Sequence, residues 1–248
     1  PDDAAIFAVP QNKAMVQSVD YFRSFIDDPY VFGKIATNHA LGDLFAMGAE
    51  PQSALAIATV PFGREVIVER TLSDLLQGAQ DVLHDVGAVL AGGHSSEGEE
   101  LAFGLTVNGL IDQSSMLRKA GMQPDDVLIL TKSIGTGTLF AANMRGKAKG
   151  RWIDNAIESM LVSNQAAARV LYENGVTACT DVTGFGLLGH LVEMTKASGC
   201  DVELIVDSLP ILEGAEETVS AGILSSLQPQ NTRLRRAISN IELWHAHP

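Results

Sequence analysis

The chain has 248 residues, of which 46% are hydrophobic and 19% charged, so it can bury a substantial core as one large or two ordinary domains. It carries 17 Lys and Arg against 30 Asp and Glu, and the resulting charge of −13 disfavours nucleic acid and anionic membrane surfaces as partners. Two cysteines argue against a disulfide scaffold, and neither a membrane span nor a signal peptide is evident, so we expect a cytoplasmic protein.

The first predicted elements are a strand and a helix. Ala14 to Val19 has strand character and ends near Asp20. Asp28 as N-cap and Pro29 as the first helical residue predict a helix, which we expect to end at Gly48.

Three further elements follow in the same half. Ser53 to Val60 is a predicted strand, and the amphipathic stretch Glu65 to Val86 is a predicted helix that ends at Gly87. A short strand at residues 89–91 leads into a glycine-rich turn, and Leu101 to Ile111 resumes strand character.

The polar segment Asp112 to Asp125 is the predicted domain boundary, so we expect domains at 1–115 and 116–248. The second domain begins with a predicted strand, and helices and strands then alternate without a strict βαβ rhythm. The predicted elements are a strand at 127–131, a helix at 153–173, a β-prone stretch at 176–180, a helix at 185–198 and a strand at 202–206. The pattern favours an α+β or mixed α/β fold.

The two ends suggest a piece of a longer polypeptide. Pro1 begins abruptly inside what resembles a functional turn, and the chain stops at Pro248 without a closing element. We therefore expect an incomplete second domain.

The segment Asp181 to His190 combines a carboxylate at the end of a β-prone stretch with a glycine-rich turn that leads into a helix. A carboxylate in this place often reaches a ligand crevice. The motif by itself leaves two interpretations equally open, a turn that lets a strand and a helix pack closely and a site for a metal-bound phosphate.

Other carboxylates stand at similar places. Asp3 lies in a terminal turn, and Asp20 lies at the end of a strand. Asp43 interrupts an otherwise small and apolar helix, where a buried carboxylate without a partner would cost several kcal/mol. Asp43 must therefore face solvent, pair with a cation or bind a metal, and Asn38 and His39 could assist it, although His39 as a core residue is the better reading.

Two glycine-rich segments could approach phosphate groups. Gly92 to Ser95 offers backbone N–H groups and a hydroxyl, and Lys132 to Thr138 is a second, weaker candidate. Gly146 and Lys147 lack the rest of a Walker A sequence, so we expect no P-loop.

Several motifs in order resemble selenophosphate synthetase, also called selenide, water dikinase. The group to which that family belongs includes aminoimidazole ribonucleotide synthetase, thiamine-monophosphate kinase and a hydrogenase-maturation factor. The motifs are residues 2–5, 18–22, 27–30, 33–48, 91–95 and 181–190, and the resemblance extends to about residue 240. Residues 181–190 are most similar to the selenophosphate branch.

The resemblance implies two α+β domains, of which the N-terminal one forms a β-barrel in a homodimer. It also implies a phosphotransferase that converts ATP, selenide and water into selenophosphate, AMP and phosphate, with ATP and Mg²⁺ as cofactors. The implied Mg²⁺ ligands are Asp3, Asp43 and Asp181, and the implied nucleotide-site residues are Asp2, Asp20, Asp43, Gly93, His94 and Ser95. We expect residues 93–95 to reach the nucleotide of the neighbouring subunit.

The sequence also departs from the family. The family's Cys or selenocysteine nucleophile and its Lys belong upstream of Pro1, and neither Cys179 nor Cys200 inherits that role. We therefore expect this chain to turn over poorly or not at all. Two alternatives are another enzyme of the same ATP-binding group, acting on a purine or thiamine intermediate, and a non-catalytic dimerisation module of a fusion protein.

Overall fold

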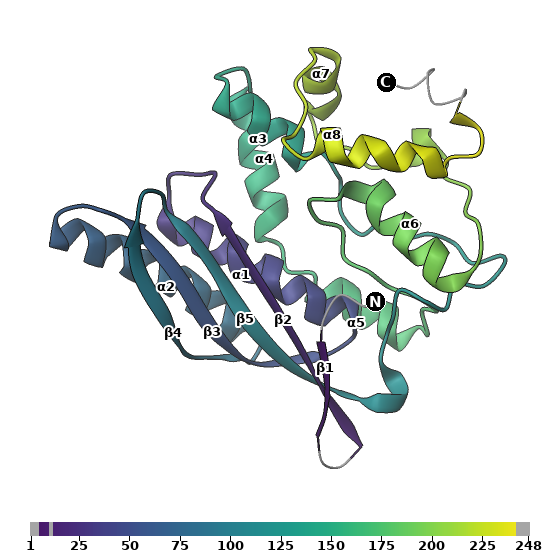
Figure 1. The fold of residues 1–248 in the computed structure, drawn as a ribbon, viewed down its shortest axis with the longest axis horizontal. Coiled ribbons are helices and arrows are strands. Elements are labelled where there is room, and N and C mark those ends of the chain that lie inside the picture. Colours follow the sequence, from purple (N-terminus) through teal and green to yellow (C-terminus); the bar gives the residue numbers. More distant parts are fainter. Residues whose placement is uncertain (1–4, 10–11, 242–248) are drawn as a thin grey trace. The chain divides into compact units, whose positions relative to one another are not determined.

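A five-stranded sheet with the order β1-β2-β5-β3-β4 forms the framework of the N-terminal half (Figure 1). This computed structural model describes residues 5–9 and 12–241. The strands are β1 (Ala5–Ala8), β2 (Lys13–Arg23), β3 (Glu50–Pro61), β4 (Val89–Gly98) and β5 (Ala102–Asp112). Neighbouring strands are antiparallel except β3 and β4, which run parallel because helix α2 (Glu65–Asp85) connects them.

Strand β2 confirms the predicted strand and extends it to Arg23. Its side chains alternate between the two faces of the sheet, so Ala14, Val16 and Phe22 lie on the face that packs into the core. Ser18 lies on that same face by the same period of two. Polar side chains therefore enter an otherwise apolar interface.

Helix α1 (Pro29–Ala46) has the predicted start. The Asp28 carboxylate accepts a hydrogen bond from the Val31 N–H at 3.0 Å, and Pro29 occupies the first turn. The chain leaves the helix through Gly48, whose φ of 74° lies in the left-handed region. Most α1 side chains are buried, which indicates that the helix is covered on more than one side.

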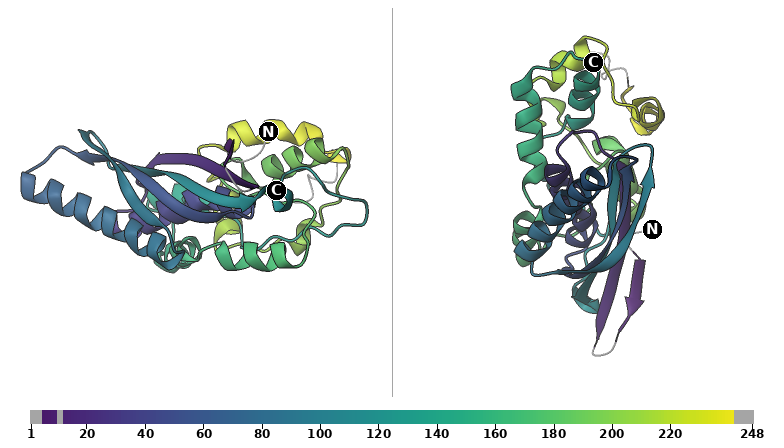
Figure 2. Two further views of the ribbon diagram at one scale, coloured as in Figure 1. Left: turned by 90° about the horizontal axis from the view of Figure 1, so that it is seen from below. Right: turned by 90° about the vertical axis from the view of Figure 1, so that its left-hand side faces the viewer.

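Helices α1 and α2 cover the same face of the sheet and touch through their backbones (Figure 2). A methyl group at Gly33 would lie 2.1 Å from the Leu75 carbonyl oxygen, and one at Gly78 would lie 2.1 Å from the Tyr30 carbonyl oxygen. Only glycine permits this approach, so the two helices depend on both positions.

The opposite face of the sheet is exposed and carries large apolar side chains. Val19 is 56% exposed and Leu55 45% exposed. Hydrogen bonds cross this face between polar side chains, among them Tyr21 with Thr59 at 2.6 Å. Since β1 and β4 are the edges of an open sheet, the described chain alone forms no closed barrel; the dimeric barrel stays a prediction.

The chain divides into two compact units. Unit 1 comprises Pro1–Arg118 and Leu161–Asp181, and unit 2 comprises Lys119–Met160 and Val182–Pro248. The mixed α/β class is confirmed. Among the helices of residues 5–9 and 12–241, none combines the length and the apolar composition that crossing a bilayer requires.

The later part of the chain is mainly helical, and its elements follow a short 3-10 turn, η1 (Gln113–Ser115). They are α3 (Thr136–Met144), α4 (Gly150–Leu161), α5 (Gln165–Glu173), α6 (Gly186–Ser198), η2 (Val206–Ser208), α7 (Ala215–Ser220), α8 (Gln228–Asn231) and η3 (Thr232–Ala237). Helix α6 confirms the predicted helix.

The predicted strands at 127–131 and 202–206 were wrong. These residues form no strand pairing, nor does the β-prone stretch 176–180, and unit 2 has one isolated parallel bridge among its described residues, between Ile134 and Ile211. Strand-forming side chains favour a pleated surface, but a strand also needs a neighbour for its backbone groups.

The single helix predicted over 153–173 is broken into α4 and α5. In an unbroken helix, the Leu161 carbonyl would accept from the Gln165 N–H. Instead, the Leu161 carbonyl accepts from Asn38 Nδ2 at 3.0 Å, and the Gln165 N–H donates to the Ser163 hydroxyl at 3.2 Å. Both partners of the helical bond are diverted, so the helix ends and a new one begins.

Candidate functional site

The predicted site residues of unit 1 lie where β2 faces the C-terminal half of α1. On β2, Ser18 and Asp20 share the inner face because they are two residues apart. On α1, His39 and Asp43 share a face because they are four residues apart. The strand and the helix therefore bring two polar pairs together within an apolar layer.

The first pair joins Ser18 to Asp43. The Ser18 hydroxyl donates a hydrogen bond to Asp43 Oδ2, and both side chains are partly buried. A hydrogen bond to a charged acceptor is about twice as strong as a neutral one. Asp43 is thus held in one orientation, with Oδ2 engaged from the strand side.

The second pair joins His39 to Asp20. His39 Nε2 lies 3.7 Å from Asp20 Oδ1, and each side chain is about one-third exposed, at 33% and 32%. The His39 ring also meets the Phe22 ring edge-on, with centroids 5.1 Å apart. His39 is therefore not a fully buried core residue, and its ring lies against Asp20 and Phe22.

Asn38 connects α1 to the segment that leads to Asp181. It is 8% exposed, and its Nδ2 donates to the Leu161 carbonyl, where residues 161–181 return to unit 1. A second tie is the Cys179 N–H, which donates to the Arg118 carbonyl at 2.9 Å. These bonds determine where the last residues of the segment lie.

Asp181 ends beside the same part of α1. A methyl group at Gly42 would lie 3.7 Å from Asp181 Oδ2, which is ordinary van der Waals contact. Gly42 immediately precedes Asp43, so the Asp181 carboxylate lies beside the turn of α1 that carries Asp43. The two aspartates are 138 positions apart in the sequence. The structure thereby brings Asp20, Asp43 and Asp181 to one region of unit 1.

Gly93, His94 and Ser95 lie elsewhere in the sheet. The predicted turn was wrong, because these residues continue β4, where His94 pairs with Ile57 in register. Two strands, β5 and β3, separate β4 from β2, which at about 4.8 Å a strand is roughly 14 Å. Within one chain, residues 93–95 on β4 therefore lie far from Asp20 on β2.

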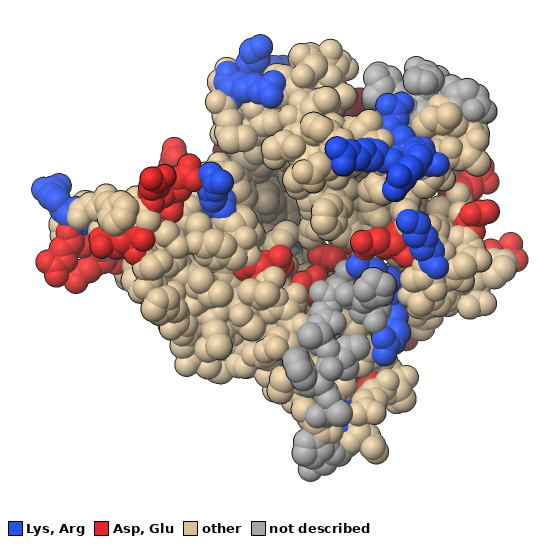
Figure 3. Space-filling view, in the orientation of Figure 1, with Lys and Arg blue, Asp and Glu red and all other residues tan. Residues whose placement is uncertain are grey.

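The close approach at Gly93 explains its residue type. A methyl group there would lie 2.1 Å from the Ala56 carbonyl oxygen, so β3 and β4 are too close for any larger residue. Glu97, near the end of β4, and Glu99 and Glu100, in the turn to β5, are exposed. Figure 3 shows acidic side chains in red at several places on the surface. Arg23 pairs with Glu100 at 2.7 Å.

Asp2 and Asp3 lie outside the described residues. Among residues that the structure describes, no three His, Cys, Asp or Glu side chains lie close enough to hold a metal ion. The donors that do meet are carboxylates and a hydroxyl, which are the hard oxygen ligands that Mg²⁺ takes. The described chain therefore supplies two of the three predicted metal carboxylates, Asp43 and Asp181, and their chemistry fits that ion.

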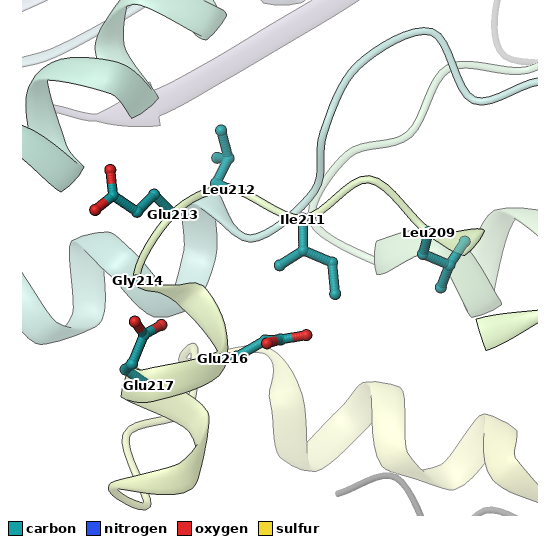
Figure 4. Close-up of a pocket in the computed structure, with 7 residues that line it drawn as sticks. All are labelled: Leu209, Ile211, Leu212, Glu213, Gly214, Glu216 and Glu217. Carbon is teal, nitrogen blue, oxygen red and sulfur yellow. The ribbon is translucent and has the colours of Figure 1, made fainter. Parts of the chain in front are cut away.

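A separate cavity of about 390 Å³ lies in unit 2. Glu213, Glu216 and Glu217 line it with four neighbours, and Glu216 points to the side of Ile211 while Glu213 points the other way (Figure 4). Carboxylates would repel a phosphate chain, and these do not converge. The cavity is therefore a poor nucleotide site.

The sequence predicted neither Ser18 as a site residue nor the role of Asn38. Ser18 could have been found, because it precedes Asp20 by two residues on a strand and must share its face. Asn38 was considered only as an assistant to Asp43, whereas it binds the Leu161 carbonyl. Nothing local signals that long-range bond.

Comparisons with known proteins identify relatives along most of the chain. The family models described as AIR synthase related protein, N-terminal domain and C-terminal domain, match residues 1–111 and 123–229. The chain is 44% identical over 231 residues to the selenide, water dikinase of Nitratidesulfovibrio vulgaris strain DP4, covering 90% of this chain and 63% of the relative. The enzyme of the same name from Caldanaerobacter subterraneus is 40% identical over 223 residues, covering 90% and 64%. The chain thus spans less than two thirds of the length of these relatives.

The solved structures agree on the fold. A crystal structure of the thiamine monophosphate kinase of Aquifex aeolicus matches with a TM-score of 0.74 over 91% of this chain and 77% of its own. AaThiL complexed with AMPPCP and TMP also matches with 0.74, over 91% and 75%. Both are 16% identical to this chain, which supports the fold alone.

Proposed function

This chain belongs to the AIR synthase related family, and we propose that it carries the ATP-binding and metal-binding core of a selenide, water dikinase. The proposed reaction transfers phosphoryl groups from ATP to selenide and water, and releases selenophosphate, AMP and phosphate. The identity of 36–44% to proteins of that name supports this function over one on a purine or thiamine intermediate.

The observation that carries the proposal is the approach of Asp181 to the turn of α1 that holds Asp43. A chain with a charge of −13 repels a triphosphate. Divalent cations bound by these carboxylates reverse that repulsion and stabilise the charge that spreads over a transferring phosphoryl group. Asp3, Asp43 and Asp181 are the proposed Mg²⁺ ligands.

The chain's own residues orient the reactants. Ser18 holds Asp43, and Asp20, with His39 against it, borders the nucleotide together with Asp2. Gly93, His94 and Ser95 are proposed to contact ATP from a second copy of the chain, because they lie roughly 14 Å from β2 within one copy. The role of each of these residues is to bind and position, which is most of what phosphoryl transfer requires of a protein.

A homodimer is the proposed assembly. The exposed apolar residues on the outer face of the sheet, such as Val19 and Leu55, offer a surface that a second copy could cover. We place the domains at 1–115 and 116–248 and the protein in the cytoplasm as parts of the same proposal. Selenide and ATP are the proposed small-molecule partners.

The test titrates Mg²⁺ in the presence of a non-hydrolysable ATP analogue and measures binding by calorimetry. Asp43→Asn should abolish or strongly weaken the metal-dependent part of binding, since it removes one metal ligand. Asp74→Asn is the matched control, because Asp74 is a carboxylate on α2 that pairs only loosely with Arg70, at 3.7 Å. Unchanged metal-dependent binding in Asp43→Asn would sink the proposal.

The product separates the proposed function from the alternative enzyme. Selenide should stimulate conversion of ATP into AMP if any turnover occurs, whereas a kinase acting on a thiamine phosphate would form ADP. ADP formed in response to a purine or thiamine intermediate, without any effect of selenide, would assign the chain to the alternative.

A further inference from the structure

The turn that follows Asp181 is held by the helix behind it. The Thr183 N–H donates to His190 Nε2 at 3.1 Å, and the Thr183 carbonyl accepts from the Gly186 N–H at 2.9 Å. Both polar groups of the Thr183 backbone are thus bound by residues of α6. The Thr183 hydroxyl also lies 3.3 Å from His190 Nε2.

His190 is well placed to act as a rigid acceptor. It is 4% exposed, and the Phe185 ring lies against it, with ring centroids 6.0 Å apart. A ring nitrogen that accepts from a backbone N–H carries no proton of its own, so the neutral imidazole bears its proton on Nδ1.

The other side of the turn is held as well. The Gly184 carbonyl accepts from Asn231 Nδ2 at 3.0 Å, and a methyl group at Gly184 would lie 2.6 Å from Leu227 Cδ1. Residues 183–186 therefore have little freedom. Their conformation is determined by α6 and by the segment around α8.

We propose that His190 is a positioning residue for the Asp181 carboxylate. The proposal rests on the function proposed above, in which Asp181 binds Mg²⁺. Asp181 precedes Thr183 by two residues, so the bond from Thr183 to His190 restricts the backbone that aims the carboxylate. A ligand held in its binding orientation in advance costs less ordering when the metal arrives.

The test compares His190→Met, which keeps the length of the side chain but removes the nitrogen acceptor, with His190→Gln, whose amide oxygen can still accept from the Thr183 N–H. His190→Met should raise the Mg²⁺ concentration for half-maximal binding of a non-hydrolysable ATP analogue about tenfold, as for other residues that orient a metal ligand. His190→Gln should restore most of the affinity. An unchanged Mg²⁺ requirement in a folded His190→Met would overturn the proposal.

A double-mutant cycle with Asp181→Asn decides whether His190 acts through Asp181. If it does, His190→Met should add little to the defect of Asp181→Asn, whereas additive defects would contradict the proposal. Should His190→Met fail to fold, the comparison of His190→Gln with His190→Asn carries the test, because the shorter amide leaves its acceptor one bond short of the Thr183 N–H.

A spectrum of the metal-free protein gives a readout that is independent of binding. The ¹⁵N chemical shifts of His190 should show an unprotonated Nε2 and a protonated Nδ1, and a protonated Nε2 would contradict the proposal. A wild-type chain without Mg²⁺-dependent binding would defeat the proposed function and this proposal with it. Binding that is normal in the wild type and equal in His190→Met would defeat only this one.

Discussion

The Ser18 hydroxyl donates to Asp43 Oδ2 across the interface of β2 and α1, and so a strand residue sets the orientation of a helix carboxylate. The two residues are 25 positions apart. Asp43 Oδ2 is thereby held from the strand side before any ion binds.

Removing this hydroxyl should weaken metal binding. We predict that Ser18→Ala raises the half-saturating Mg²⁺ concentration by about 10- to 100-fold, because an orienting partner of a ligand is lost. Ser18→Thr, which retains the hydroxyl, is the control and should bind as the wild type does. The measurement is calorimetric titration of Mg²⁺ with an ATP analogue, and equal affinity in Ser18→Ala would show that the bond is unimportant.

Gly33 should be essential for stability. Gly33→Ala places a methyl group 2.1 Å from the Leu75 carbonyl oxygen, so α1 and α2 must separate, at a cost of about 1–3 kcal/mol. Gly150→Ala is the matched control, since a methyl group at that helical glycine meets nothing within 4 Å, and it should be neutral or stabilising by about 0.4–1 kcal/mol. Urea denaturation measures both, and an unaffected Gly33→Ala would contradict the close helix contact.

The two adjacent glycines of β4 should differ. Their φ angles are 158° and 157°, so the backbone strain of an alanine is nearly the same at Gly92 and Gly93. The space differs, because a methyl group lies 3.7 Å from the Leu55 side chain at Gly92 but 2.1 Å from the Ala56 carbonyl oxygen at Gly93. Gly93→Ala should therefore lower the thermal unfolding midpoint more than Gly92→Ala does, and the reverse order would rule out the parallel pairing of β3 and β4.

The Tyr30–Asp81 bond should make stability depend on pH at both extremes. The Tyr30 hydroxyl donates to Asp81 Oδ2 at 2.6 Å. This bond raises the pKa of Tyr30, and it lowers the pKa of Asp81, to which Gln77 also donates. A lowered carboxyl pKa contributes stability that is present above its ordinary value of 3.8 and is lost as the pH falls through the folded value.

The tyrosine acts in the opposite direction. A raised pKa contributes stability that is present below its ordinary value of 10.0 and is lost as the pH rises towards the folded value. Tyr30→Phe should flatten both limbs in denaturation curves recorded across pH, and Tyr172→Phe, which leaves Asp81 unchanged, should flatten neither. Identical pH profiles for Tyr30→Phe and the wild type would refute this assignment.

Local patterns in the sequence determined much of unit 1. Asp28, Pro29 and Gly48 predict α1 correctly because caps, proline and a left-handed glycine act within one or two turns. Alternation predicts β2, and the interruption of small and apolar residues in α1 singles out Asp43 as a residue that needs a partner. These features depend on neighbours in the chain, so the chain alone reveals them.

Only the tertiary structure decided which partners those residues take. Helix α4 ends where the Asn38 side chain donates to the Leu161 carbonyl. Asn38 is 123 positions away, so no local pattern signals this bond. The Gly-Gly segment became a strand because β3 offers it a parallel neighbour, and residues 127–131 found no such neighbour in the described chain. Ser18 beside Asp43, and Asp181 beside Gly42, are likewise contacts between distant segments, which no periodicity of 2 or 3.6 residues can encode.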